Sequence, residues 1–374
     1  MKNRRYEGGA GRYGRLACTC IVAIFVMLAA GFQTASSALA QEAEGEQTPF
    51  GAAVEVRRIL TEVRVVHYDG SPVLGLGPGD FRVKVGGKRA EVRSVLWIPS
   101  TAEAAKDAAG EATDHPSSPH HPVEPEGRLI VVLFQIDPKF HISRTIGLVR
   151  MAPRASEFVS GLSPGDKVAV LVFDSHLELL SDFTGNHEAT AETLHVQRVL
   201  RKVSDGTEPT SPSLTEHFDF EEARDAASMT EALELIGDAL KPIPGTKSLV
   251  LFGYALGRMS AGTRVTIDDG YGKAMEALSA ARTSVFSLDI TNADAHSLAL
   301  GLRTIAEDTG GFYVKTHLFP ETAMKKLVRV ISSYYELEII PPPNLGDEYT
   351  IKVSVDRPRT DVYVRQDHPS KDKW

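Results

Sequence analysis

Cysteine is almost missing from this sequence. The chain of 374 residues holds two, Cys18 and Cys20, and both lie in an apolar stretch near its amino terminus. If that stretch is removed on export, the mature chain has no cysteine. A disulfide framework, a thiol nucleophile and a cysteine metal site are then all excluded.

Long runs of basic residues are missing as well. The 41 Lys and Arg are outnumbered by 49 Asp and Glu, which gives a formal net charge of −8. The first 40 residues carry five basic side chains and one acidic side chain, a charge of +4, so the remaining residues carry −12. A chain this acidic offers no electrostatic footprint for a phosphate backbone, and we expect no nucleic acid partner.

Two signatures of catalytic sites are also absent: the sequence has neither a His-Glu-x-x-His motif nor a phosphate-binding loop. Gly75-x-Gly77-x-Gly79 has the spacing of part of a nucleotide-binding loop, but a strand pattern follows it instead of a helix, which indicates a turn. We therefore expect a protein that is not an enzyme.

The first forty residues have the three parts of a secretory signal peptide. A basic region precedes an apolar core from Leu16 to Phe32 and the small-residue ending Ala38-Leu39-Ala40. We predict that residues 1–40 are cleaved after Ala40 and that the protein is exported to the periplasm, the cell surface or the medium, with no membrane span after cleavage. An uncleaved anchor is the alternative, because the apolar core of 17 residues is at the lower limit for crossing a bilayer.

Short alternating patterns follow the signal segment. Val54–Tyr68, Asp80–Val85 and Ala90–Trp97 alternate apolar and polar residues and are separated by Gly-containing turns. This predicts a small antiparallel β domain over residues 41–98. Residues 99–127 are rich in Ala, Glu, Pro, Ser and His, which predicts a low-complexity linker. Strand patterns recur over residues 334–374 and predict a C-terminal β tail.

Strand and helix patterns alternate between residues 128 and 333. Apolar runs at Leu129–Phe134, Val168–Phe173 and Ser248–Phe252 are typical of central parallel strands, and further strands are expected at 283–290 and 312–315. Helical spacing separates them, at residues 145–162, 187–203, 229–240, 272–281 and 295–309. The predicted fold is α/β: a doubly wound, mostly parallel open sheet with helices on both faces, flanked by small β units at both ends.

Short motifs occur in a fixed order along the chain. The amino-terminal unit holds Asp69-Gly70, Pro72-Val73, Asp80-Phe81 and Gly87-Lys88; the central block holds Leu162-Ser163-Pro164-Gly165-Asp166 and Ile305-Ala306-Glu307-Asp308-Thr309-Gly310-Gly311; the tail holds Tyr335-Glu336-Leu337 and Asp356-Arg357-Pro358. In this order they resemble von Willebrand factor type A proteins, in the form found in secreted acidobacterial proteins. The resemblance covers residues 54–98 and 128–365.

The resemblance implies a divalent cation at the carboxyl ends of the strands, held by Asp-x-Ser-x-Ser, a Thr and a further Asp. Here the first motif reads Asp137-Pro138-Lys139-Phe140-His141, so that Lys139 and His141 occupy the serine positions. The closing aspartate position falls on Gly253 or Tyr254, and Thr207, Thr210 and Thr230 stay open as the threonine. We expect a degenerate metal-ion-dependent adhesion site without a metal; Mg²⁺ or Mn²⁺ would bind only if other residues rebuilt it.

Charge gives the same expectation. An ammonium at Lys139 beside Asp137 would replace the metal's positive charge and repel a cation. The resulting hypothesis is an exported adhesion or scaffolding module that binds a protein or cell-envelope component, with an acidic group on the partner facing Asp137, Lys139 and His141. Residues 204–228 are either a binding loop beside this site or a disordered excursion. A structural envelope subunit with an idle surface, and an envelope enzyme using His141, are the alternatives.

Overall fold

The computed structural model describes residues 58–99, 127–203, 211–259, 265–267 and 269–366. They belong to one compact unit, residues 55–374. The predicted signal peptide and nearly all of the predicted linker lie outside the described residues. None of the described helices is long and apolar enough to cross a membrane.

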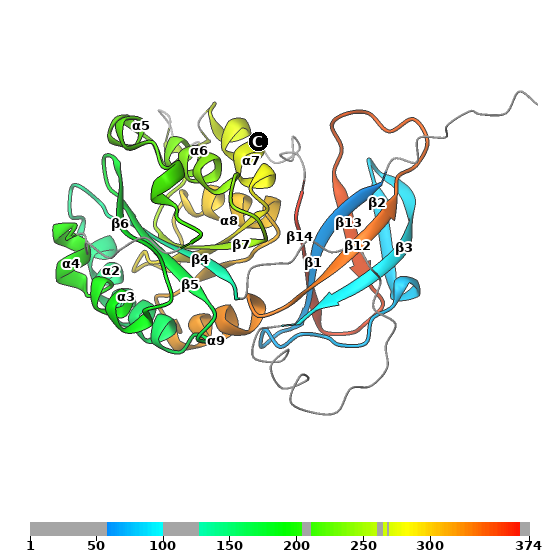
Figure 1. The fold of residues 1–374 in the computed structure, drawn as a ribbon, viewed down its shortest axis with the longest axis horizontal. Coiled ribbons are helices and arrows are strands. Elements are labelled where there is room, and N and C mark those ends of the chain that lie inside the picture. Colours follow the sequence, from blue (N-terminus) through cyan, green and yellow to red (C-terminus); the bar gives the residue numbers. More distant parts are fainter. Residues whose placement is uncertain (1–57, 100–126, 204–210, 260–264, 268, 367–374) are drawn as a thin grey trace, which may run out of the picture. The chain divides into compact units, whose positions relative to one another are not determined.

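A mixed six-stranded sheet occupies the central block, with strand order β11-β10-β7-β4-β5-β6 (Figure 1). Five strands are parallel and β6 is antiparallel at one edge. Their bounds are β4 Leu129–Gln135, β5 Lys167–Phe173, β6 Leu177–Thr184, β7 Lys247–Gly253, β10 Thr283–Asp289 and β11 Tyr313–Lys315. Every residue of β4 is buried, which is why its sequence is an unbroken apolar run up to Gln135.

Helices cover both faces of this sheet (Figure 1). Alternate residues of β4 enter different cores: Leu129, Val131 and Leu133 enter one, and Ile130, Val132 and Phe134 enter the other. The first core is completed by α5 Phe220–Asp225, α6 Met229–Leu240, α7 Tyr271–Ala280 and α8 Ala299–Asp308. The second is completed by α2 Ile142–Ser160, α4 Val196–Arg201 and α9 Pro320–Val330, together with Leu194, which directly follows α3 His187–Thr193.

The predicted helices are confirmed with three adjustments. The helix predicted over 145–162 spans Ile142–Ser160. The helix over 229–240 has its predicted bounds, and Ser228 and Glu231 form a capping box at its start. The helix predicted over 187–203 is divided into α3 and α4 at Leu194 and His195. The helix predicted from residue 295 begins at Ala299. Short elements complete the central block: η2 Thr215–His217, β8 Arg258–Met259 and β9 Val265–Thr266.

The strands at the two ends of the chain form one antiparallel sheet, with order β13-β2-β3-β12-β1-β14. The bounds are β1 Ile59–His67, β2 Phe81–Val85, β3 Lys88–Ile98, β12 Tyr334–Ile340, β13 Ile351–Val355 and β14 Thr360–Val364, with η1 Pro78–Asp80 before β2. The prediction of a separate β unit at each end is therefore wrong, because β12 lies between β3 and β1.

The physical reason is core size. About 45 residues bury too little apolar surface to be stable alone, so strands from both ends share one core. Tyr335 of β12 shows the sharing: its ring centroid lies 4.6 Å from that of Trp97, and its hydroxyl donates to the Val73 carbonyl at 2.8 Å. The Leu76 amide donates to the same hydroxyl at 3.3 Å. The amino-terminal segment thus depends on the tail for its packing.

Contacts also join the antiparallel sheet to the central block. Buried Arg64 of β1 donates to the Ser284 hydroxyl at 3.2 Å and to the Gly310 carbonyl at 3.4 Å. Glu62, also buried, pairs with Arg365 at 2.7 Å and with Arg282 at 3.4 Å. This group of charges lies beside the buried Lys247 at the start of β7.

Candidate functional site

The carboxyl ends of four adjacent parallel strands meet at one edge of the mixed sheet, which we call the carboxyl-end edge. In strand order it carries Asp289 at the end of β10, Tyr254 after β7, Asp137 after β4 and Asp174 after β5. In open α/β sheets ligands bind outside this edge, where the direction of winding changes. The predicted site residues therefore lie at the place where a binding site is expected.

Asp137 is the centre of a compact hydrogen-bond network. It is buried, with 6% of the residue exposed. Its carboxylate accepts from the backbone amides of Lys139 at 3.0 Å and His141 at 3.3 Å, and it also contacts the His141 Nδ1 atom. The Arg144 guanidinium donates to it at 2.8 Å. Burial raises the pKa of Asp137, but hydrogen bonds from His141, Lys139 and Arg144 outweigh burial and hold that pKa below its ordinary value.

The cation paired with Asp137 is Arg144, whereas the sequence predicted Lys139. Lys139 contacts the carboxylate through its backbone amide, and its side chain is exposed. The Phe140 amide donates to the Asp137 carbonyl at 2.9 Å, which closes a tight turn over residues 137–140. Arg144 reaches the carboxylate from the first turn of α2, and its guanidinium lies over the Tyr254 ring at 4.1 Å from the centroid.

Close helix packing fixes the position of Arg144. At Gly147, one turn further along α2, a Cβ would lie 1.6 Å from the Ile290 carbonyl oxygen, so only glycine lets the helix approach the chain after β10 this closely. The Asn292 amide donates to the Ser143 carbonyl at 3.1 Å at the same junction. The amino-terminal turn of α2 is thereby held against the carboxyl-end edge.

Exposed apolar side chains surround this network. Phe140 is 60% exposed and Ile142 is 77% exposed. Phe140 has φ of 50°, a left-handed backbone conformation that costs a bulky residue about 1–3 kcal/mol. The tight turn around Asp137 therefore holds an aromatic ring in solvent at the cost of backbone strain, and such strain is typical of functional loops.

The other carboxylates at the edge also have partners within the chain. Asp174 pairs with Lys202 at 2.7 Å, and the same ammonium contacts Glu178 at 2.8 Å. Asp289 is bonded by His296 Nε2 and by the Tyr313 hydroxyl, each at 2.7 Å. In the part of the chain that the structure describes, no group of three or more His, Cys, Asp or Glu side chains is arranged to hold a metal ion.

The remaining metal-ligand positions are filled by other groups. Gly253 and Tyr254 carry no carboxylate, and the Gln135 side chain accepts from the Tyr254 and Ala255 amides at 2.9 and 3.0 Å. Thr230 is buried against the Ser228 hydroxyl at 2.9 Å. Thr207 and Thr210 lie outside the described residues. The sequence did not predict this role of Gln135. A polar residue at the end of an apolar strand could have indicated it.

His141 and Asp137 form an imidazole–carboxylate pair, the part of a catalytic triad that orients a base. No hydroxyl of the described residues is bonded to the other ring nitrogen of His141. One Gly-x-Ser-x-Gly sequence, Gly161–Gly165, joins the end of α2 to β5, whereas a nucleophile elbow follows a strand and begins a helix. At His141, the described residues therefore offer an imidazole–carboxylate pair without a bonded hydroxyl.

Part of the predicted insertion over 204–228 is packed against the sheet. Leu214 and Phe218 are buried in the core with α6. The Asp182 carboxylate of β6 accepts from the Ser213 hydroxyl and from the Leu214 amide, both at 2.6 Å. Residues 211–228 are thus held by the fold, and residues 204–210 lie outside the described part.

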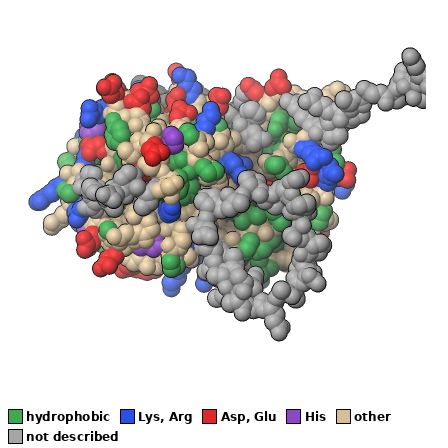
Figure 2. Space-filling model, viewed as in Figure 1, with side chains coloured by type: hydrophobic (Ala, Val, Ile, Leu, Met, Phe, Trp, Pro, Cys, Tyr) green, Lys and Arg blue, Asp and Glu red, His purple; other side chains and the backbone are tan. Residues whose placement is uncertain are grey.

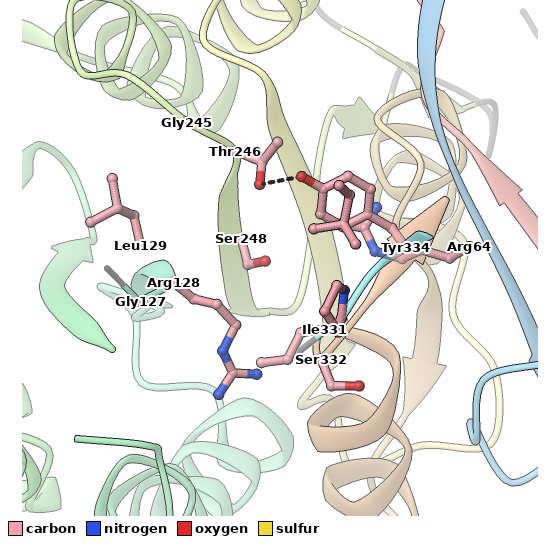
Figure 3. A pocket seen from close by; sticks show the side chains of 12 residues that line it. Arg64, Gly127, Arg128, Leu129, Gly245, Thr246, Ser248, Ile331, Ser332 and Tyr334 are labelled. Carbon is pink, nitrogen blue, oxygen red and sulfur yellow. Dashed lines mark hydrogen bonds between the residues drawn. The ribbon is translucent and has the colours of Figure 1, made fainter. Parts of the chain in front are cut away.

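A concave region lies at the opposite ends of the strands (Figure 3). It is a cavity of about 100 Å³ whose lining includes Arg64, Arg128, Ser248, Ser332 and Tyr334. Drug-sized ligands need roughly 300–1,000 Å³. Its polar groups are largely engaged within the chain: Arg128 pairs with Asp166, and Thr246 donates to the Tyr334 hydroxyl at 3.4 Å. The cavity suits a few waters.

Comparisons with known proteins give weak structural similarity alone. BatB from Bacteroides thetaiotaomicron has 15% identity and a TM-score of 0.36, over 55% of this chain and 98% of that chain. A von Willebrand factor type A protein from Catenulispora acidiphila has 10% identity and a TM-score of 0.39, over 79% and 75%. Mussel byssus proximal thread matrix protein 1, with zinc in its MIDAS motif, has 12% identity and a TM-score of 0.34, over 55% and 47%. No family model and no curated protein matches the chain.

Proposed function

We propose that this protein is an exported, non-enzymatic protein-binding module of the von Willebrand factor type A kind, which binds its partner at the carboxyl-end edge without a metal ion. The observation that carries the proposal is the Asp137 network. The carboxylate that would hold a metal already bonds to Arg144 and His141. The strand order, with one antiparallel edge strand and helices on both faces, supports a doubly wound sheet of this family.

The partner contacts follow from what surrounds the network. Lys139, Phe140, His141 and Ile142 are all exposed, and they combine one ammonium with three apolar or aromatic groups. Buried aromatic anchors with a charge at their rim are the pattern of energetic centres in protein interfaces. We therefore expect an acidic group on the partner to face Lys139 while Phe140 enters an apolar pocket.

Two alternatives, a structural subunit and an enzyme, predict different contacts at Phe140 and His141. A structural subunit with an idle surface would leave Phe140 uncontacted in the assembled protein. An envelope enzyme using His141 would need a nucleophile or a bound water at His141 Nε2. The strained exposure of Phe140 favours a binding surface over an idle one, since an idle loop gains nothing from that strain.

Photo-crosslinking in the producing cell tests the proposal. With a benzophenone side chain at position 140 of the full chain, we expect adducts to a protein partner. These should persist in EDTA, and they should fall about tenfold with Lys139→Glu, because the charge at the rim is reversed. The matched control carries the same side chain at position 188. Glu188 is exposed in α3, which begins directly after antiparallel β6, near the amino ends of the parallel strands and away from the carboxyl-end edge. Adducts that disappear in EDTA, or that form equally from position 188, would contradict metal-free binding at this edge.

A further inference from the structure

The antiparallel sheet carries a row of cations that the proposed function does not use. Lys352 of β13 lies directly opposite Lys84 of β2, and Lys84 lies directly opposite Arg89 of β3. All three side chains are exposed, whereas Val83 and Val85 on either side of Lys84 are buried. The pairing places the three cations side by side on the outer face of three adjacent strands. We call them the basic row.

The basic row lacks internal counterions. Among the described residues, Lys84, Arg89 and Lys352 take part in no ion pair. Arg82, two residues before Lys84 on the same face, pairs with Asp356 at 2.8 Å. Like charges directly opposite each other on neighbouring strands are destabilising. Repulsion between the three cations therefore lowers the stability of the fold, and no ion pair of these side chains among the described residues offsets it. Such a row stands out in a chain whose net charge is −8.

The surface around the row is hollowed. A concavity of about 690 Å³ is lined by the basic row, Arg82 and Ser354, with Val83 and Val353 as its only apolar residues. Figure 2 shows Lys and Arg side chains gathered over this part of the antiparallel sheet. None of the large exposed hydrophobic residues of the described chain lines it. A membrane surface or a folded protein partner would need such residues, because both interfaces bury apolar groups.

The edge strand argues against an added peptide strand. β13 is the last strand of the sheet, but the Gln366 side chain already donates to the Ile351 carbonyl and accepts from the Ile351 amide, both at 2.7 Å. A peptide pairing along β13 would have to displace this amide. The available ligand surface is therefore the charged face and not the strand edge.

We propose that the basic row binds a linear carboxylated polysaccharide. Neighbouring strands lie about 4.7–4.9 Å apart, so the three cations form a straight line roughly 10 Å long across the strands. An extended polyanion laid along this line meets one cation at each strand, and Arg89 can bind a carboxylate through two parallel hydrogen bonds. The negative charge of the rest of the chain disfavours denser polyphosphates such as nucleic acids.

Binding of polygalacturonate to the full chain at low salt tests this proposal. We expect Lys84→Gln, Arg89→Gln and Lys352→Gln together to weaken binding at least tenfold, with no loss of melting temperature because mutual repulsion is removed. The control carries Lys241→Gln, Lys273→Gln and Lys325→Gln, the same change of charge at exposed positions of the mixed-sheet block, and should bind within about twofold of the parent. Binding should weaken with added salt, and neutral dextran should not bind.

Three results would overturn the proposal: unchanged affinity in the basic-row variant, an equal loss in the control variant, or tighter binding to polyglutamate or to anionic vesicles than to polygalacturonate. The last result would assign the row to an acidic protein or to a membrane. The outcome is independent of the Phe140 crosslinks, since the two surfaces share no residue.

Discussion

Replacing Arg144 by methionine is expected to lower the free energy of unfolding by about 3 kcal/mol at neutral pH. The guanidinium is the only Arg or Lys side chain that contacts Asp137 among the described residues, and removing the partner of a buried carboxylate leaves an uncompensated charge. Methionine retains an unbranched apolar chain over Tyr254, so the loss reports mainly the charge. Because the pKa of Asp137 lies below its ordinary value, the pair stabilises the parent fully above about pH 4 and is lost in more acidic solution.

Chemical denaturation measures this effect against two comparisons. Arg154→Met removes an arginine of the same helix that pairs with the exposed Glu321, and should cost less than about 1 kcal/mol. Adding Asp137→Asn to the Arg144→Met variant should restore part of the stability, because the unpaired charge is then gone. A loss below about 1 kcal/mol for Arg144→Met, with no recovery in the double variant, would mean that Arg144 does not neutralise Asp137.

Stability is expected to rise by about 2 kcal/mol between pH 7 and pH 9.5, because of Lys247. This residue is 3% exposed, and burial together with nearby Arg282 and Arg365 lowers its pKa to about 8. The unfolded chain binds that proton with a pKa near 10.5, so between these values the unfolded state holds more protons and the folded state gains stability as pH rises. Burying the charged form is what destabilises the fold at pH 7.

Denaturation curves at pH 7, 8.5 and 9.5 test this slope, with Lys247→Met as the control. The methionine variant should lose most of the rise, although it also loses the bond from the ammonium to the Ala281 carbonyl at 3.0 Å. The series stops below pH 10, because burial raises the pKa of Tyr271 and Tyr313 and reverses the sign there. A parent whose stability is flat or falls between pH 7 and 9.5 would show that Lys247 is not desolvated as described.

Local pattern was sufficient for most elements of the mixed sheet. The run at residues 129–134 is short and rich in β-branched residues, which favours a strand buried on both faces. The helix over 229–240 begins at a capping box and has a clear apolar face. The pairing of the two chain ends was not predictable in this way. Period-two alternation shows which face of β1 and β12 is buried but not which strand lies beside them, because pairing is set by contacts more than 200 residues apart.

The contacts of Asp137 were predictable in part, and the cation that pairs with it was predicted wrongly. Asp137 and His141 lie together as their spacing suggested, because both belong to the turn that follows β4. Lys139 was assigned as the cation because it is near in sequence, yet the tight turn directs only its amide to the carboxylate. Arg144 is seven residues from Asp137, and its role depends on the approach of α2 at Gly147, which no motif encodes.

Calorimetric titration of the full chain with Mg²⁺ and Mn²⁺, together with thermal melting with and without EDTA, tests the central claim most directly. We predict no saturable heat up to millimolar cation and no change in melting temperature, because Arg144 already compensates the charge of Asp137. Micromolar binding accompanied by a higher melting temperature would contradict it. In that case Arg144 would have to leave Asp137, and the carboxyl-end edge would be a metal-dependent adhesion site.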